Sequence, residues 1–579
     1  MSRNLQETRL VFASGIALMI GCFLYFWYIV PYHVCFKEQI QLFTYNSSYI
    51  LSYFSKPAAF ACLAGDFLTQ FFYFKIAGAA IITLLLVLEW WLILLILKRF
   101  SAVETLRATS PQRATPLQCT IALLPVIVEW ISFANPSFSV ALSVSFIIAL
   151  SAFIVYAKTG GKTAVIMGIL LIPTLYIIAG ASVFLFVILI TLYNIHRNKK
   201  FLIFHSSFFI FLAVITPLIF RHIYLLTLKQ AYFYPFQDIK QMLSLVVLAF
   251  VVLIFVCFKK LRGQNSGILY FAISLVVLVS ILITGLIKNT DRKQESIFGI
   301  TIEAYHNNWD KVLKIAEKAE LKSPVATCYT NIALSKKSLL GERLMDFYQP
   351  FTSGLLLPIA PGSGWLTIFS GSDAYYHIGD MGMAQHAAML GMIFSPKQRS
   401  ARMMERLLET NLISGDTAAA VKYARILEST LFHKIKPDRL RDNLQQGTFR
   451  KDMIRNSTNT QASLELLAES NPDNLPAVDY LLCYYLLNKN IPAFFKAYTT
   501  YCKGKNTHVP KVYAEALMIY FAVTKGTINE VSQYGIPSEA VKSFGEYTRL
   551  YEKSNGNLAP VQKNFPNTYW LFYHFATMN

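Results

Sequence analysis

The chain has 579 residues, of which 54% are hydrophobic and only 15% are charged, and its formal net charge is +20. Residues 1–288 hold 28 charged side chains, whereas residues 289–579 hold 58. Since about a quarter of the residues of a soluble domain are charged, the first part cannot be an ordinary soluble domain. We therefore predict a membrane domain over 1–288 and a soluble domain over 289–579. The basic excess lies in loops of the membrane part, so it does not indicate a nucleic-acid partner.

Nine apolar runs in the first part approach the length needed to cross a bilayer, about 20 residues. They cover residues 11–30, 76–97, 117–133, 138–156, 163–178, 181–195, 201–220, 242–258 and 268–287. The fifth and sixth runs are short and join at Gly180 with almost no loop, so one hairpin and one interrupted helix both fit. The sequence predicts an all-α fold that begins with a polytopic domain of about nine transmembrane helices.

Lysine and arginine residues in the loops predict the orientation. Fourteen of them lie on the side of the N-terminus and six on the opposite side. Loops rich in Lys and Arg stay in the cytoplasm. We therefore expect a cytoplasmic N-terminus in the cell inner (cytoplasmic) membrane. The odd number of helices then places residues 289–579 outside the cytoplasm, which is the periplasm in a Gram-negative bacterium.

The first external loop, residues 31–75, is too long and too apolar for a simple connector. Residues 39–54 and 58–74 have the pattern of amphipathic helices and carry many aromatic side chains. Such helices settle at the membrane interface. Glu38 and Asp66 are the only acidic residues of the loop, which makes them candidate site residues.

Two further acids, Glu89 and Glu129, lie within predicted transmembrane helices. Ionisable groups inside a membrane are costly and are functional candidates by default. For Glu89 the alternative is a protonated carboxyl that is hydrogen-bonded to a neighbouring helix. Glu129 lies near the external end of its helix, and we expect it to reach the interface.

The second part has amphipathic helices in pairs that are joined by short polar turns. The pairs are 296–306 with 309–319, 397–412 with 416–429, and 474–487 with 491–501. This pattern resembles tetratricopeptide-type repeats, and a non-repeating helical domain is the alternative. A single hairpin cannot bury its apolar face, so stacked hairpins form a superhelix with a concave surface.

Two aromatic or apolar segments depart from this pattern. Residues 349–372 are apolar but rich in Pro and Gly, so we expect an irregular stretch that packs on the membrane part or on the repeats. Residues 568–577, TYWLFYHFAT, are expected to form a helix that caps the repeats.

An external first loop with an outward helical domain resembles the C-type glycosyltransferases, integral membrane enzymes that use polyprenyl-phosphate-linked sugars. In that superfamily the loop carries an acidic general base or metal ligand. The matching residues are Glu38 in FKEQIQLF and Asp66 in AGDFLTQFFYF. The resemblance implies that Arg221, His222 or Lys229, in the loop 221–241, holds the carrier phosphate.

The whole chain more closely resembles an uncharacterised multi-pass membrane protein family of Bacteroidota. The resemblance rests on the QLF…GDFLTQFFYF loop and on the aromatic TYW ending, and it implies no activity.

Two functions therefore stay open. The first is transfer of a sugar from a polyprenyl-phosphate carrier at the external membrane face. The alternative is a non-enzymatic membrane-anchored scaffold whose repeats bind an envelope protein or peptide. Transport has less support, because no repeated hydropathy half is present. The sequence has no cofactor motif, and nothing in it supports a divalent metal.

Overall fold

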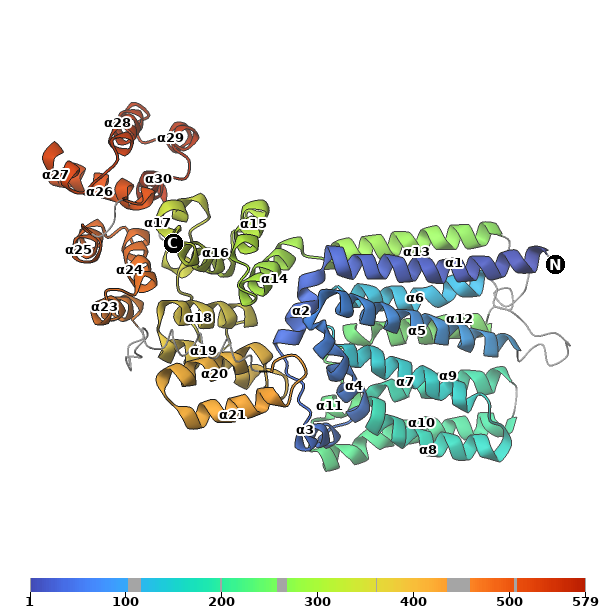
Figure 1. Cartoon of the computed structure of the whole chain (residues 1–579). Coiled ribbons are helices and arrows are strands. Elements are labelled where there is room, and N and C mark those ends of the chain that lie inside the picture. The colour runs from blue at the N-terminus through green and yellow to red at the C-terminus, as the bar shows by residue number, and fades with distance from the viewer. Residues whose placement is uncertain are drawn as a thin grey trace. The chain divides into compact units, whose positions relative to one another are not determined.

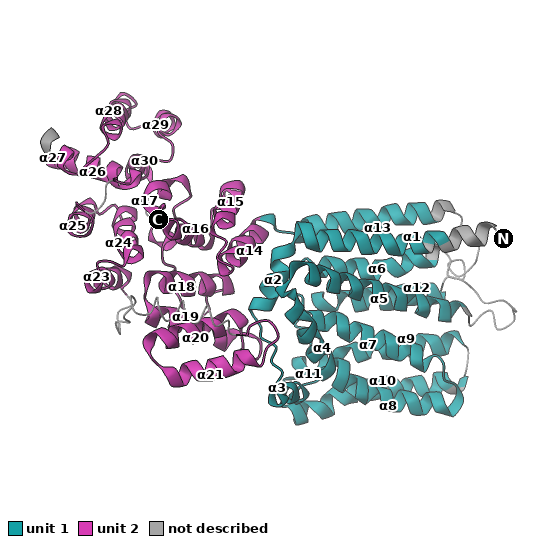
Figure 2. Ribbon diagram, in the orientation of Figure 1, with its two compact units in different colours: residues 1–292 teal, residues 293–579 magenta. Residues whose placement is uncertain are grey.

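A computed structural model describes residues 2–102, 116–197, 200–257, 268–360, 362–434, 459–504 and 508–577. The chain divides into two compact units, residues 1–292 (unit 1) and residues 293–579 (unit 2; Figure 2). Every regular element of the described residues is a helix.

Unit 1 is built mainly from long apolar helices that lie side by side (Figure 1). They are α1 (Ser2–Leu24), α5 (Lys75–Ala102), α6 (Pro116–Phe133), α7 (Val140–Tyr156), α8 (Gly161–Ala179), α9 (Val183–His196), α10 (Lys200–Tyr224), α12 (Leu243–Cys257) and α13 (Ile268–Asn289). Within the described residues, six helical spans are long and apolar enough to cross a membrane, and α8 and α9 count as one of them. Helices α6 and α7 are apolar but shorter. Unit 1 therefore makes the chain a multi-pass membrane protein, and the number of nine crossings stays a prediction.

The α8–α9 segment is a hairpin, which decides between the two alternatives at Gly180. Gly180 has φ 63° and ψ −134°, a backbone conformation that only glycine adopts readily. The Ser145 hydroxyl, near the start of α7, donates to the Ala179 carbonyl at 2.6 Å, next to this turn. At the other end of α7, Tyr156 bonds to Asn194 of α9. Helix α9 therefore runs parallel to α7, whereas α8 runs antiparallel to it.

The loop 31–75 differs in part from its prediction. It contains α2 (Pro31–Gln39), α3 (Ser47–Ser52) and α4 (Ala59–Thr69). The predicted helix over 39–54 is wrong, because the chain leaves the helix after Gln39 and begins another at Ser47. Asn46 explains the new start, since its side chain accepts a hydrogen bond from the Ser48 amide at 3.0 Å and caps α3. A short helix, α11 (Leu228–Phe233), lies in the loop 221–241.

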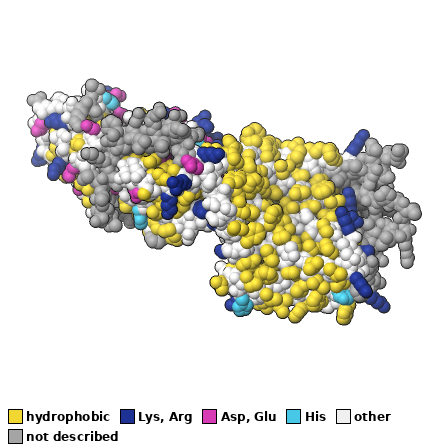
Figure 3. Space-filling model, turned by 60° about the horizontal axis from the view of Figure 1, so that its bottom comes forward, with side chains coloured by type: hydrophobic (Ala, Val, Ile, Leu, Met, Phe, Trp, Pro, Cys, Tyr) yellow, Lys and Arg dark blue, Asp and Glu magenta, His cyan; other side chains and the backbone are white. Residues whose placement is uncertain are grey.

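Apolar side chains cover much of the surface of unit 1 (Figure 3). Strongly exposed examples are Phe12, Leu84, Phe204 and Val276, at 71%, 62%, 77% and 65%. Such a surface is unfavourable in water and fits a lipid environment.

Unit 2 consists of shorter helices that follow one another in antiparallel pairs (Figure 1). They are α14 (Arg292–Tyr305), α15 (Trp309–Ala319), α16 (Pro324–Lys336), α17 (Leu340–Arg343), α18 (Trp365–Ile378), α19 (Met381–Phe394), α20 (Ala401–Ser414), α21 (Thr417–Glu428), α23 (Thr460–Ser470), α24 (Leu475–Leu487), α25 (Ile491–Tyr501), α26 (Lys511–Thr524), α27 (Ile528–Gln533), α28 (Ser538–Lys553), α29 (Leu558–Asn564) and α30 (Tyr569–Phe575). All six helices of the three predicted pairs are present within a few residues of their predicted bounds.

Four of the hairpins share one turn. A residue with positive φ ends the first helix, and the Asp or Asn after it precedes the second helix. The backbone amide of that Asp or Asn donates to the carbonyl five residues earlier, as in a Schellman motif. The donors are Asn308, Asp380, Asp416 and Asn490, and the last three also cap the next helix with their side chains. The same local geometry therefore recurs along unit 2.

The predicted irregular stretch 349–372 is correct only in its first part. Helix α18 begins at Trp365, immediately after Gly364, and contains the last residues of the predicted stretch. Leu355, Leu356 and Leu357 are buried in the core of unit 2. The irregular part therefore packs on the helices of unit 2.

The C-terminal helix α30 is anchored by a buried acid. Tyr569 and Trp570 are buried, and the Tyr569 amide donates to a carboxyl oxygen of Glu515 at 2.6 Å. The Trp570 indole donates to the backbone carbonyl of the same residue at 2.9 Å. The predicted C-terminal helix is thus confirmed, and it closes over α26.

This anchor predicts a pH-dependent stability. Burial raises the pKa of Glu515 to about 7, above its value in the unfolded chain, so the folded state binds the proton more tightly. Its stabilising contribution is complete below about pH 4.5 and is lost as the pH rises towards 7. We expect the melting temperature of unit 2 to fall between pH 5 and pH 7.5, and Glu515→Gln to reduce this fall. Equal pH dependence in both proteins would contradict the assignment.

Candidate functional site

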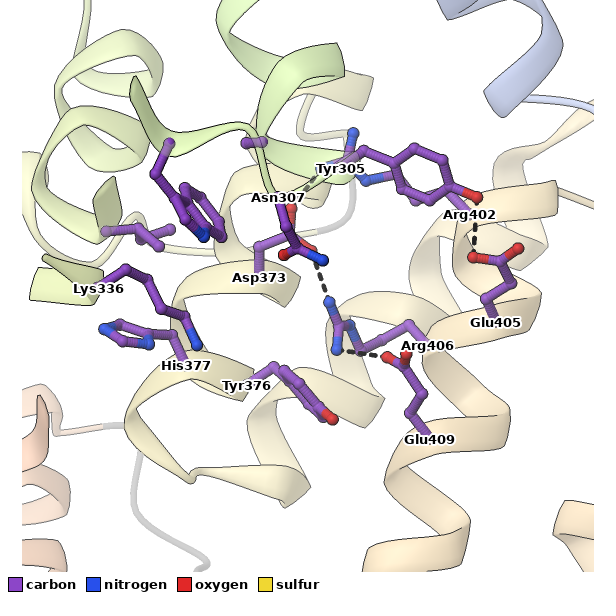
Figure 4. Close-up of a pocket in the computed structure, with 13 residues that line it drawn as sticks. Tyr305, Asn307, Lys336, Asp373, Tyr376, His377, Arg402, Glu405, Arg406 and Glu409 are labelled. Atoms are coloured by element: carbon purple, nitrogen blue, oxygen red, sulfur yellow. Dashed lines mark hydrogen bonds and ion pairs between the residues drawn. The ribbon is translucent and has the colours of Figure 1, made fainter. Parts of the chain in front are cut away.

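The described part of unit 2 contains a cavity of about 190 Å³ at the side of four alternate helices (Figure 4). Helices α14, α16, α18 and α20 contribute most of its lining, together with the turn before α15. The polar side chains around it are Tyr305, Asn307, Lys336, Asp373, Tyr376, His377, Arg402, Glu405, Arg406 and Glu409. Polar groups thus converge on one cavity from segments that lie about 100 residues apart.

Asp373 is the centre of the charge network in this cavity. One of its carboxyl oxygens forms an ion pair with Arg402 and accepts a hydrogen bond from the Tyr329 hydroxyl at 2.9 Å. The other oxygen accepts from Arg406 at 2.9 Å. Burial raises the pKa of Asp373, but the Arg402 and Arg406 guanidinium groups outweigh this effect and hold the pKa below its ordinary value. Asp373 is therefore a carboxylate near neutral pH.

Aromatic rings hold both guanidinium groups in place. The Arg406 guanidinium lies 3.7 Å from the centre of the Tyr376 ring, and that of Arg402 lies 4.8 Å from the centre of the Phe369 ring. Such cation–π contacts are worth about 0.5–2 kcal/mol each. The cavity wall is therefore rigid and has both polar and aromatic faces.

Two glutamates complete the wall. Glu409 accepts from Arg406 at 2.6 Å. Glu405 accepts from the Tyr305 hydroxyl at 2.9 Å and contacts the His433 ring nitrogen Nδ1 at the same distance. Lys336, Arg402 and Arg406 thus face Asp373, Glu405 and Glu409, so the formal charges of the lining balance.

Sequence reasoning missed this site, although one signal was present. Arg402, Glu405, Arg406 and Glu409 have the spacing i, i+3, i+4, i+7, which places them on one face of a helix. On an isolated sequence this pattern indicates a solvated face with local ion pairs. Only the packing of α18 against α20, which brings in Asp373, identifies it as the wall of a cavity.

The fold of unit 1 brings the two predicted intramembrane acids together. Glu89 of α5 and Glu129 of α6 are both completely buried, and the Ser143 hydroxyl of α7 hydrogen-bonds to both carboxyls, at 2.8 Å in the case of Glu89. The expectation that Glu129 reaches the interface is wrong, because its side chain is completely buried among the helices of unit 1.

Helix α2 covers the neighbouring turn between α6 and α7. The Lys37 ammonium donates to the Phe138 carbonyl at 2.8 Å, and a ring nitrogen of His33 contacts the Phe133 carbonyl at 3.2 Å. Burial lowers the pKa of Lys37 to about 7, so this side chain titrates near neutral pH. Glu38, the first predicted catalytic acid, is buried on the same helix at 4% exposure.

Asp66, the second predicted catalytic acid, lies on α4 and is partly buried. It accepts a hydrogen bond from the Tyr53 hydroxyl at 2.5 Å, and this hydroxyl also contacts that of Tyr49. Burial and the nearby Asp66 carboxyl raise the pKa of Tyr53. Asp66 is thus part of a small aromatic cluster within the loop 31–75.

The three predicted phosphate-binding residues lie in or next to the loop 221–241. The Arg221 side chain donates to the Leu226 carbonyl at 3.1 Å, and His222 and Lys229 are exposed. Within the described residues, no hydrogen bond or ion pair joins Arg221 or Lys229 to Glu38 or Asp66. The structure therefore does not assemble these five residues into one contact network.

A metal centre has no support among the described residues, since no three His, Cys, Asp or Glu side chains gather in a group that could hold an ion.

The fold and these sites define a multi-pass membrane protein with a helical second unit. The chain belongs to the family of unknown function DUF6057, whose model matches residues 7–576 and thus both units. No curated protein and no solved structure matches the chain.

Proposed function

We propose that this protein is a membrane-anchored binding protein of the cell envelope. Unit 1 holds it in the inner membrane, and unit 2 is a tetratricopeptide-like repeat domain on the extracytoplasmic side. The ligand is an extended peptide segment of an envelope protein, bound in the cavity around Asp373. The observation that carries the proposal is this cavity, with lining from four alternate helices of unit 2.

The chemistry of the lining favours a peptide over a polyanion. Three basic and three acidic side chains face the cavity, so a phosphate-rich ligand gains no net attraction. A peptide backbone carries both donors and acceptors, and these match a wall with both kinds of group. The rings of Tyr305, Trp309 and Tyr376 add aromatic surface, which is common where proteins bind peptides.

The repeated hairpin turn supports the repeat architecture. Hairpins with the same internal turn orient their two helices alike, and in a stack their first helices line one surface. The cavity is lined by such first helices, α14, α18 and α20. Sugar transfer from a polyprenyl-phosphate carrier remains a prediction. Within the described residues, Arg221 and Lys229 are not joined to Glu38 or Asp66 by a hydrogen bond or an ion pair.

A charge reversal at the cavity tests the proposal. Lys336 is exposed and lines the cavity, whereas Lys322 is exposed outside it. We expect Lys336→Glu to weaken peptide binding about fivefold, because one exposed charge contributes about 1 kcal/mol. The matched variant Lys322→Glu should bind normally.

Binding is measured in intact cells with a photoreactive residue at position 307, at the cavity. The crosslinked peptide is identified by mass spectrometry, and the same residue placed at position 322 serves as the control. We expect a single major crosslinked segment from position 307 that Lys336→Glu reduces. Equal crosslinking from both positions, or no effect of Lys336→Glu, would contradict the proposal.

A further inference from the structure

The carboxyl groups of Glu89 and Glu129 form a closed polar site among apolar helices. They lie on α5 and α6, and neither residue is exposed. Within the described residues, the second oxygen of each carboxyl is buried without a hydrogen-bond partner. No Lys, Arg or His of the described residues forms an ion pair with either carboxyl. Two carboxylates in such a place would repel each other and would lack the water that stabilises charge.

The two contacts of Ser143 favour a proton on this pair. The Ser143 hydroxyl contacts one oxygen of Glu89 and one oxygen of Glu129. A hydroxyl has a single hydrogen to donate. When Ser143 donates to one carboxyl, the second contact is a hydrogen bond only if the other carboxyl carries a proton and donates it to the Ser143 oxygen. The geometry thus favours at least one protonated carboxyl in this pair, in addition to the hydrogen of the Ser143 hydroxyl.

The polar groups closest to the Glu89–Glu129 pair along α6 lie towards the end of unit 1 that carries the loop 31–75. Phe133, whose carbonyl contacts His33, follows Glu129 by one helical turn, or about 6 Å. The ammonium of Lys37 lies 5.5 Å from the centre of the Phe133 ring. On the other sides, the Cys22 thiol of α1 interacts with Glu89, and the Ser244 hydroxyl of α12 interacts with Glu129. The contacts of His33 and Lys37 with Phe133 therefore place α2 one helical turn from Glu129.

We propose that Glu89, Glu129 and Ser143 form a proton-binding site inside the membrane, and that its proton exchanges with water past Lys37 and His33. The proton moves between a carboxyl oxygen and water, and no bond between heavier atoms changes. This site is independent of the peptide cavity in unit 2, so the failure of one proposal leaves the other standing.

Infrared spectroscopy of the full chain in lipid vesicles tests the bound proton. A protonated carboxyl has a carbonyl stretch that is separate from the bands of a carboxylate. We expect this band at pH 7 in the wild type and its loss in the double variant Glu89→Gln and Glu129→Gln. All proteins compared carry Glu515→Gln, because the carboxyl of Glu515 in unit 2 has a pKa of about 7 and would otherwise contribute to the band. A wild-type spectrum without the band, or a band that the double variant retains, would contradict a proton bound to Glu89 or Glu129.

Transfer of the vesicles into heavy water tests the exchange. Deuterium shifts the band, so the time course of the shift measures access of water to the pair, and it needs no variant. We expect Lys37→Met to slow the shift without changing the size of the band. A wild-type band that never shifts overturns proton exchange, and an unchanged rate in Lys37→Met overturns the route. Loss of the band on addition of sodium chloride at pH 7 would identify a sodium ion as the ligand instead.

Discussion

Changing Asp373 to asparagine is expected to lower the free energy of unfolding of unit 2 by about 3–5 kcal/mol, the cost of removing one partner from a buried ion pair. Asp373 neutralises Arg402 and Arg406, whose side chains are only 3% and 14% exposed. Asparagine keeps the shape of the side chain but leaves both guanidinium groups without this charge. The loss of stability is thus electrostatic, because the substitution leaves no unfilled space in the core.

The measurement is proteolysis of the purified full chain in increasing urea, in which cleavage sites of unit 2 report its unfolding. The matched control is Asp310→Asn, which breaks the exposed ion pair with Lys337. The Asp310 side chain is 84% exposed, so the control should lose less than about 1 kcal/mol. Similar losses for the two variants would show that the charge network around Asp373 does not stabilise unit 2.

Changing Gly180 to alanine is expected to destabilise unit 1 by several kcal/mol. The backbone conformation of Gly180 costs another residue about 1–3 kcal/mol. An added Cβ atom would also lie 2.3 Å from the Tyr234 carbonyl oxygen and 3.0 Å from the Cβ of Ala58, and such overpacking costs about 1–3 kcal/mol more. The hairpin turn, the loop 31–75 and the loop 221–241 meet at this one position.

This variant is compared with Gly160→Ala, which lies before α8 and whose added Cβ would meet no atom within 4 Å. The fraction of protein that stays monodisperse in mild detergent after heating measures the difference. We expect Gly160→Ala to behave like the wild type and Gly180→Ala to aggregate at a lower temperature. Equal behaviour would contradict the close contact at the turn.

The periodicity of apolar residues predicted most helices of both units, because it records which face of each helix is buried. Apolar periodicity did not predict the helix boundaries that are set by capping residues or glycines. Asn46 begins a new helix inside the amphipathic pattern of residues 39–54, and the helix at Trp365 follows directly after a glycine-rich segment. The repeated turn of unit 2 also appeared in the sequence only as short polar stretches.

The candidate sites were harder to predict, since they depend on which helices are neighbours. Glu89 and Glu129 were each recognised as costly inside a membrane, but 40 residues separate them and no periodicity relates them. Their common contact exists only because the fold places Ser143 of α7 next to both carboxyls. Asp373 in the same way meets Arg402 and Arg406 only through the packing of α18 against α20.

The recurring turn of unit 2 also affects how the protein varies in evolution. In a stack each hairpin contacts mainly its neighbours, and here four hairpins have the same turn between their two helices. Gain or loss of a complete hairpin therefore preserves the direction of the chain, whereas loss of a single helix reverses it. We expect relatives to differ in length by whole helix pairs in this unit.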